Sequence, residues 1–420
     1  MGIISEIFKR GKFDDIQLAV DIGTGSVKTA SFKINQDNKI EIIGVGRSLI
    51  EKNSDEEGGF NKTVIARAAK KAVREVFWDQ EPPRFQPAIM GISGSFLKGI
   101  ASSFKHTRDN PEIKIEEAEV ANLIQKFEYK ALEKIKSDFI RETGWHETDL
   151  NIVNALVQET RIDGWQVDDI FGKDGKELEF KLFNTFIPKI NFEELTSIIR
   201  DIGINPILTT IQMLGVTGVL KWEEFSPSRD VILIDIGYES TDISIVRSGI
   251  LEGIKTFSFG GKALTRRISK TFGVGYQEAE DIKISFSNKK LSKAVLNKIA
   301  KILEKDFDTW ASGVILNLES FSKTELFPKN IFLFGGSSHI SGLAKSLANK
   351  KLKDNLPFTE EPKIDFLSFD KIKGISDPKN FFKDRGDIPL FSLARLLPEL
   401  ASNKKEISRI LGRVLRMMKT

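Results

Sequence analysis

Two short segments of the sequence have the residue types and spacing of an anion-binding turn. Residues 21–26 (DIGTGS) follow the apolar run 16–20, and residues 235–242 (DIGYESTD) begin at the end of a second apolar run, 214 positions later. Glycine lets a backbone approach a ligand closely, and consecutive backbone N–H groups form an anion cradle. Two such turns facing each other would surround a phosphate chain with N–H groups and hydroxyls.

The aspartates that begin the turns, Asp21 and Asp235, are candidate metal-binding residues. Mg²⁺ dehydrates reluctantly, so we expect both carboxylates to hold it mostly through water. One Asp-Ile-Gly segment alone is as typical of a simple hairpin as of an anion site. Two copies in matching contexts, with a third glycine-rich turn after an apolar run at 335–338 (GGSS), favour the anion site.

Both turns join predicted strands of the same kind, which indicates an internal duplication and an α/β fold class. Strands are predicted near 16–20, 27–34, 40–49, 89–93, 151–160, 162–167, 178–187, 231–235, 241–247, 250–258, 331–334 and 363–367. Apolar residues at helical spacing predict helices near 61–77, 115–136, 191–202, 261–272, 292–318, 341–352 and 389–400.

Composition excludes several classes of protein. The chain has 420 residues, of which 40% are hydrophobic and 29% charged, as in a globular protein of several domains. It has no Cys and only three His, so disulfides, thiolate zinc sites and a histidine metal cluster are not expected. No apolar run reaches about 18 residues, and we expect neither a membrane-spanning helix nor a signal peptide.

The positive charge is concentrated at the end of the sequence. Residues 404–420 have six Lys and Arg against Glu406 alone, whereas the whole chain has a net charge of +4. A nucleic-acid-binding protein usually spreads its charge over a folded face, so we expect no nucleic-acid partner. In the same segment, apolar residues at helical spacing form one face, namely Ile407, Ile410, Leu411, Val414, Leu415 and Met418. Basic residues flank that face, among them Arg409, Arg413 and Arg416.

An apolar face with cationic flanks is typical of a helix that lies in the interface of an anionic membrane. Packing of this helix against the body of the protein, or binding to a partner protein, are the alternatives. Near the other end, the apolar residues of segment 3–8 precede three basic residues. That segment suits either membrane contact or a cover for the first strand.

The three glycine-rich turns resemble the phosphate-1, phosphate-2 and adenosine motifs of the actin/Hsp70/sugar-kinase ATPase superfamily. Within it, the chain resembles the FtsA family of bacterial cell-division proteins over nearly its whole length. The segments that carry this resemblance are 90–95 (MGISGS), 115–120 (IEEAEV), 259–265 (FGGKALT), 278–283 (EAEDIK), 389–397 (PLFSLARLL) and the terminal amphipathic helix. The resemblance implies a duplicated actin-like (ribonuclease H-like) ATPase fold with two lobes and an inserted subdomain called 1C.

The same resemblance implies the domain boundaries and the site. The implied parts are 1–84, 188–228 and 385–403 for subdomain 1A, 85–187 for 1C, 229–258 and 329–384 for 2A, 259–328 for 2B, and 404–420 for the membrane helix. The implied cofactors are ATP and Mg²⁺. Implied phosphate-binding residues are Asp21, Gly23, Thr24, Gly25, Ser26, Lys28, Asp235, Gly237, Ser240 and Thr241. Implied residues around the nucleoside are Gly260, Gly261, Glu280, Lys283, Gly335, Gly336 and Ser337.

Four residues that the resemblance assigns to the site have a second interpretation. Lys28 could equally point into solvent, and Glu280 with Lys283 could be an exposed ion pair at helical spacing. Gln212 would orient the attacking water by resemblance, or it simply closes a loop. A neutral amide hardly takes a proton from water, so any ATP hydrolysis should be slow.

The resemblance implies a cytoplasmic protein, peripheral on the inner face of the cell membrane, that tethers the division ring. It would bind the C-terminal peptide of the tubulin-like FtsZ through subdomain 2B and form head-to-tail filaments with itself, since a heterologous contact that does not close gives filaments. A pilus-assembly adaptor resembling PilM is the first alternative, although such an adaptor needs no amphipathic tail. A kinase or phosphatase of the same superfamily, acting on a small molecule, is the second.

Overall fold

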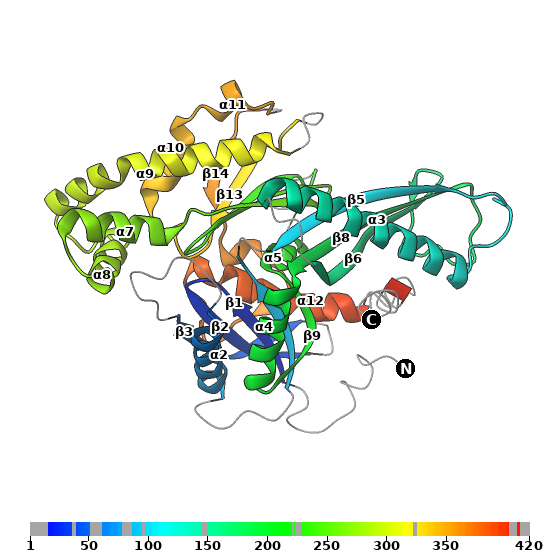
Figure 1. Cartoon of the computed structure of the whole chain (residues 1–420), viewed down its shortest axis with the longest axis horizontal. Coiled ribbons are helices and arrows are strands. Elements are labelled where there is room, and N and C mark those ends of the chain that lie inside the picture. The colour runs from blue at the N-terminus through cyan, green and yellow to red at the C-terminus, as the bar shows by residue number, and fades with distance from the viewer. Residues whose placement is uncertain are drawn as a thin grey trace.

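The computed structural model describes residues 16–35, 39–50, 61–77, 86–94, 97–143, 150–220, 222, 228–321, 326–358, 360–402 and 410–411. Figure 1 shows a first lobe around β1 to β4, a second lobe around β10 to β14, and an elongated insert built from α3 and β5 to β8.

The first lobe is a six-stranded sheet with the order β15-β3-β2-β1-β4-β9. Its strands are β1 (Gln17–Ile22), β2 (Ser26–Ile34), β3 (Ile40–Leu49), β4 (Gln86–Ile92), β9 (Ile204–Ile211) and β15 (Ile375–Ser376). Helices α2 (Lys62–Val76) and α4 (Lys189–Asp201) pack together on this sheet, while α5 (Gln212–Val219) and α12 (Ile388–Ser402) form a second packed pair. The apolar residues of α2 are buried because they recur at helical spacing, as the sequence predicts.

The second lobe repeats this plan. Its strands are β10 (Val231–Ile236), β11 (Thr241–Arg247), β12 (Ile250–Phe257), β13 (Asn330–Phe334) and β14 (Lys363–Phe366). Its helices are α7 (Gly261–Phe272), α8 (Tyr276–Ser287), α9 (Lys293–Glu319), α10 (Ser341–Asn349) and α11 (Leu352–Asn355). Short 3₁₀ helices η1 (Phe369–Lys371) and η2 (Arg385–Asp387) lie on the return path to the first lobe.

The predicted duplication is confirmed by the strand register. In the first lobe β1 pairs antiparallel with β2 and parallel with β4, and in the second lobe β10 pairs antiparallel with β11 and parallel with β13. Asp21 lies opposite Lys28 in the first pair, and Asp235 lies opposite Asp242 in the second. The two glycine-rich turns are therefore equivalent positions of one repeated unit.

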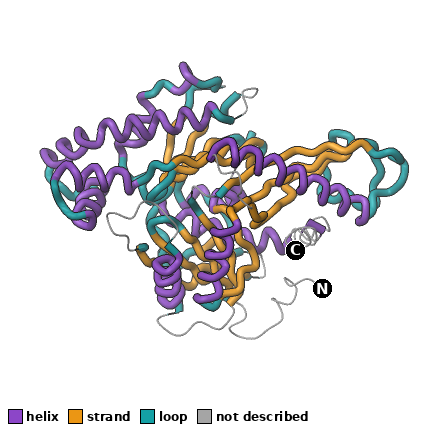
Figure 2. The backbone as a smooth tube through the Cα atoms, viewed as in Figure 1, coloured by secondary structure: helices purple, strands orange, loops and turns teal. Residues whose placement is uncertain are grey.

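The insert extends the sheet of the second lobe rather than that of the first. It consists of β5 (Lys98–Thr107), α3 (Glu117–Thr143), β6 (Leu150–Ile162), β7 (Trp165–Gln166) and β8 (Glu177–Pro188). Strand β5 meets β12 at Ile100 and Gly253, so that one nine-stranded sheet runs through both parts (Figure 2). The side-chain amide of Gln158 exchanges two hydrogen bonds with the backbone of Leu251, at 2.9 and 3.0 Å.

Most predicted elements are confirmed within a few residues. Strand β5 was not predicted, and residues 206–220, an apolar stretch, contain most of β9 and the whole of α5. Among the helices of the described residues, none has both the length and the apolarity needed to cross a bilayer.

Candidate functional site

The two predicted anion-binding turns have the same closed shape. The N–H of Gly23 donates to the carbonyl of Ser26 at 3.0 Å, and the N–H of Gly237 donates to the carbonyl of Ser240 at 2.9 Å. Each turn follows a fully buried strand, β1 or β10, which fixes its position. The duplication therefore extends to the hydrogen bond that closes each turn.

The structure brings these turns, more than 200 residues apart in sequence, into direct contact. The backbone N–H of Glu239 donates to the hydroxyl of Thr24 at 3.3 Å. A β-carbon on Gly25 would lie only 2.6 Å from Cγ of Tyr238, so the absence of a side chain there permits the approach. The predicted arrangement of two facing turns is thus realised between the lobes.

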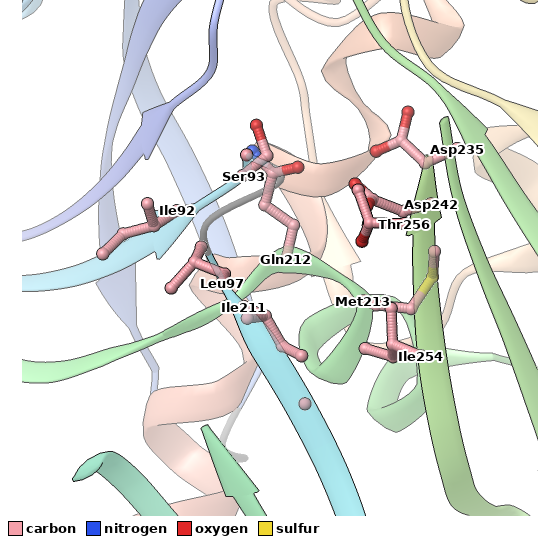
Figure 3. Close-up of a pocket in the computed structure, with 12 residues that line it drawn as sticks. Ile92, Ser93, Leu97, Ile211, Gln212, Met213, Asp235, Asp242, Ile254 and Thr256 are labelled. Atoms are coloured by element: carbon pink, nitrogen blue, oxygen red, sulfur yellow. The ribbon is translucent and has the colours of Figure 1, made fainter. Parts of the chain in front are cut away.

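Below the turns, a pocket lies between the lobes, and its polar side chains come from both (Figure 3). Gln212, the first residue of α5, faces it from the first lobe, and Asp235 and Asp242 face it from the second. The Gln212 amide donates to the carboxylate of Asp21, and the Thr256 hydroxyl donates to Asp242 at 2.5 Å. Apolar side chains, among them Ile92, Leu97 and Ile211, line the rest of the pocket.

The carboxyl groups of this region hold their protons unusually tightly. Burial raises the pKa of Asp21 to about 6, although Lys28 and the hydrogen bond from Gln212 oppose the rise. The pKa of Asp235 rises to about 8 because of burial and because Asp242 and Asp21 are like charges nearby. Burial also raises the pKa of Asp242 to about 6. Burial outweighs the nearby cation, Lys28, so the site favours either protons or a bound cation on these carboxyl groups.

Lys28 does not point into solvent. Its ammonium group donates to the carbonyl of Gly386 and lies 3.3 Å from Asp387, in the segment that returns from the second lobe to α12. Arg47 binds the other oxygen of Asp387 at 2.7 Å. The predicted phosphate-binding lysine therefore ties the first turn to the connection between the lobes.

The third predicted turn packs on the second. Gly335 has a φ of +91°, a backbone conformation that favours glycine, and a β-carbon there would clash with the carboxylate of Asp235. The Ser337 hydroxyl donates to the carbonyl of Gly237 at 2.8 Å. A β-carbon on Gly336, by contrast, would meet nothing within 4 Å. Its open face is where a flat base could lie against the backbone.

The glycines that begin α7 also serve close packing. A β-carbon on Gly260 would lie 2.6 Å from the carbonyl oxygens of Gly237 and Tyr238, and one on Gly261 would lie 2.5 Å from the hydroxyl of Ser337. These predicted cofactor-binding residues thus hold α7 against the second turn. Nearby, Lys262 pairs with Glu239 at 2.7 Å.

Glu280 and Lys283 form an ion pair at 2.8 Å on α8, and this pair is not a surface feature. Only 6% of Lys283 is exposed, and burial lowers its pKa. The Thr265 hydroxyl donates to Glu280 at 2.5 Å. The Lys283 ammonium lies 5.7 Å from the ring centroid of Tyr238, so the pair faces the second turn.

Thr241 lies behind the second turn rather than in front of it. The residue is fully buried, its hydroxyl donates to the carbonyl of Phe259 at 2.7 Å, and the indole N–H of Trp310 donates to that hydroxyl at 3.0 Å. These bonds occupy the hydroxyl within the fold. Ser240 is also buried, and its carbonyl closes the turn.

The residues present fit a nucleotide with its metal ion. The buried carboxylates of Asp21 and Asp235 have raised pKa values, so a cation between them would replace protons. Within the described ranges no group of three or more acidic or histidine residues has direct metal-ligand spacing. The glycine backbone of the turns and Lys28 would contact the phosphates, and the open face of Gly336 would contact the base.

Most of the predicted membrane helix lies outside the described residues, including Ile407, Arg409, Arg413, Val414, Leu415, Arg416 and Met418. So does the N-terminal segment 3–8. Ile410 and Leu411 are described, and they are only 1% and 3% exposed within the apolar core of the insert. This position agrees with packing against the body, one of the alternatives that the sequence leaves open.

Sequence analysis assigned no role to three residues of the site. Asp242 and Tyr238 lie within the second motif, and Asp387 directly precedes α12. A cross-strand alignment of the two repeats finds Asp242, because it occupies the position of Lys28. No local signal indicates Asp387, whose partners Lys28 and Arg47 are more than 300 residues away.

Two lobes built on the same strand–turn–strand repeat, with the phosphate-type turns facing each other between them, define the duplicated actin-like ATPase fold. The predicted fold class is confirmed. A solved structure titled PilM-PilN type IV pilus biogenesis complex aligns with a TM-score of 0.61 and 15% identity, over 91% of this chain and 98% of that one.

The sequence comparisons identify the more particular similarity. A family model described as cell division protein FtsA matches residues 232–379. Cell division protein FtsA of Pseudomonas aeruginosa is 21% identical over 376 residues, which are 81% of this chain and 83% of that protein. FtsA of Bacillus subtilis is 23% identical over 371 residues, 82% of this chain and 78% of that protein. The predicted resemblance to FtsA is confirmed over most of the chain.

Proposed function

We propose that this chain is an FtsA-type protein of bacterial cell division that binds ATP with Mg²⁺ between its two glycine-rich turns. The observation that carries the proposal is the direct contact of the turns, in which the N–H of Glu239 meets the hydroxyl of Thr24. A phosphate oxygen between the turns would accept hydrogen bonds from donors on both sides.

The side chains of the two lobes would have different tasks. Lys28 would exchange part of its contact with Asp387 for a phosphate oxygen, and the turn 23–26 would supply backbone N–H groups. Asp21 and Asp235 would hold Mg²⁺, largely through its waters. The ion would supply electrostatic stabilisation of the phosphate charge.

Gln212 is the residue we assign to water positioning. It is buried, it lines the pocket between the lobes, and its amide donates to Asp21. An amide orients a water molecule but takes no proton from it, so any hydrolysis is expected to be slow. Glu280 and Lys283 would face the ribose, and Gly335, Gly336 and Ser337 would cover the adenosine.

The cellular role we propose follows from the FtsA similarity. The chain would form head-to-tail filaments with itself, bind the C-terminal peptide of FtsZ through residues 259–328, and attach the division ring to an anionic membrane through residues 404–420. Its place would then be the cytoplasmic face of the cell membrane. Ile410 and Leu411 are buried in the insert, so membrane attachment would require them to leave this core.

A PilM-like adaptor of pilus assembly is the second candidate. The alignment to the PilM-PilN structure covers 98% of that chain, and a tail packed into the insert needs no membrane. Such an adaptor would bind a short peptide of a membrane protein. The two candidates differ in whether residues 404–420 bind lipid.

Co-sedimentation with anionic liposomes in ATP·Mg²⁺ separates the two candidates. The full chain would be compared with a chain ending at Asn403 and with I407E/V414E, which places charge on the apolar face. T420E, on the polar face of the same helix, is the matched control. We expect the full chain and T420E to pellet and to coat vesicles with filaments, while the other two stay in solution. If all four stay in solution, the adaptor becomes the leading function.

A further inference from the structure

The two turns differ most at their second and third positions. Between the glycine and the serine that close each turn, the first has Thr24 and Gly25, and the second has Tyr238 and Glu239. Since the closing hydrogen bonds match, the backbone accommodates a large aromatic ring without a change of turn. The position of the Tyr238 ring is therefore set by the residues around the turn and not by the shape of the turn itself.

On one side, the ring of Tyr238 lies against the first turn. A β-carbon on Gly25 would come within 2.6 to 3.1 Å of three atoms of the Tyr238 side chain. Next to this contact, Glu239 and Thr24 join the turns by their hydrogen bond. The ring thus closes the space between the turns, where the proposed site would accept a phosphate chain.

At its other end, the Tyr238 side chain is held by α8. Its hydroxyl forms a hydrogen bond of 2.5 Å with the hydroxyl of Tyr276, the first residue of that helix. Lys283, about two turns further along α8 on the nucleoside side, has its ammonium 5.7 Å from the ring centroid. The side chain therefore spans the cleft from the phosphate turns to the ribose side.

We propose that Tyr238 is the gate of the nucleotide cleft, which rests on the nucleotide site proposed above. Its ring fills the space against Gly25 when no nucleotide is bound, and it swings away from Gly25 and Tyr276 when the phosphate chain of a nucleoside triphosphate enters. Glycine at position 25 serves both states, because a side chain there would meet either the ring or the phosphate.

A gate of this kind changes the rate at which the nucleotide associates with the protein. Only the open population accepts ligand, so the apparent affinity falls by the fraction that is open. Loss of the ring should speed association about tenfold, if the closed state is favoured by a ratio of about ten to one. Loss of the Tyr276 hydrogen bond alone should give a smaller increase, because the ring still packs on Gly25.

Stopped-flow mixing of the full-length chain with a fluorescent ATP analogue and Mg²⁺ measures this directly. The variants are Y238A, which removes the ring, and Y238F, Y276F and their double variant, which remove the hydrogen bond. Y129A is the matched control, because Tyr129 is half exposed on α3 of the insert. Thermal unfolding of each variant verifies the fold.

The gate predicts about tenfold faster association for Y238A and no change for Y129A. It also predicts equal, smaller increases for Y238F, Y276F and the double variant, since all three lack the same bond. Equal association rates of the nucleotide with wild type and Y238A would contradict the proposed gate but not the proposed nucleotide site. Weaker binding of Y238A through faster dissociation would make the ring a contact surface instead. If neither wild type nor Y238A binds the nucleotide, both the proposed nucleotide site and the proposed gate are contradicted.

Discussion

The two halves of the molecule present the same backbone with different charges beside it. At the position where Asp21 faces Lys28 across β1 and β2, Asp235 faces Asp242 across β10 and β11. The first half thus pairs an acid with a base, and the second pairs two acids. The duplication has kept the turn and changed the side chain that stands opposite its aspartate.

The protonation of the two aspartates follows this difference. Lys28 opposes the rise in the pKa of Asp21, which reaches about 6, whereas Asp242 adds to the rise for Asp235, which reaches about 8. One lobe therefore offers a cation and the other a concentration of negative charge. A phosphate chain with its metal ion has the complementary arrangement, with phosphate toward the first lobe and metal toward the second.

The largest expected effect is the pH dependence that Asp235 confers on stability. Its pKa is raised in the folded state, so its contribution is fully present below the ordinary value of 3.8 and is lost as the pH rises through about 8. D235N has no such loss. Between pH 5 and pH 8 its free energy of unfolding should therefore rise by up to about 4 kcal/mol relative to that of wild type. Urea unfolding at both pH values measures it, and parallel curves for the two proteins would refute it.

Next in size is the loss of the lysine in the first half. K28M leaves Asp387 with Arg47 alone and deprives Asp21 of a nearby cation, so we expect a loss of about 3 kcal/mol at pH 7. K33M on the same strand is the control, because Lys33 is exposed and should change stability by less than about 0.5 kcal/mol. Equal unfolding midpoints for K28M and K33M would show that the pairing matters little.

A similar effect is expected where the second half opposes two acids. D242N keeps an oxygen that accepts from Thr256 and removes the like charge beside Asp235. Because the pKa of Asp242 is itself raised to about 6, the variant should be more stable than wild type by up to about 3 kcal/mol at pH 8 and little changed at pH 4. A variant less stable than wild type at pH 8 would mean that the Asp235–Asp242 repulsion is not the cause.

The last effect concerns the insert and tests whether the pH dependence belongs to the cleft. Burial raises the pKa of Glu128 to about 7, and Asn184 donates to its carboxylate at 2.7 Å. E128Q should raise the free energy of unfolding by up to about 3 kcal/mol at pH 8 and leave it unchanged at pH 4. Its effect should add to that of D235N because the two sites share no partner. A strongly non-additive double variant would show that insert and cleft titrate together.

Much of the fold could be predicted because it depends on local patterns. Buried strands of the meanders read as short apolar runs, and glycine marks each turn between them. Strand β5 was missed because it alternates small and polar residues, with Lys105 and Thr107 exposed on one face. Its place depends on pairing with β8 and β12, and no local signal encodes that pairing.

The sequence predicts the turns of the site but not the contacts between residues that are far apart in sequence. Motifs located both aspartates, but the pairing of Lys28 with Asp387 depends on how the chain returns from the second lobe. The tail is a similar case. Helical spacing predicts that Ile410 and Leu411 share an apolar face, yet it cannot distinguish a membrane from the core of the insert, where they lie.

The central claim is that the cleft between the turns binds ATP and that Mg²⁺ displaces protons from its acids. Calorimetric titration of the full chain with ATP·Mg²⁺ at pH 7.5, in two buffers of different ionisation enthalpy, tests both parts. The account predicts one nucleotide per chain and a release of protons from Asp235 that D235N abolishes. An absence of binding heat in either buffer, or binding without proton release, would contradict it.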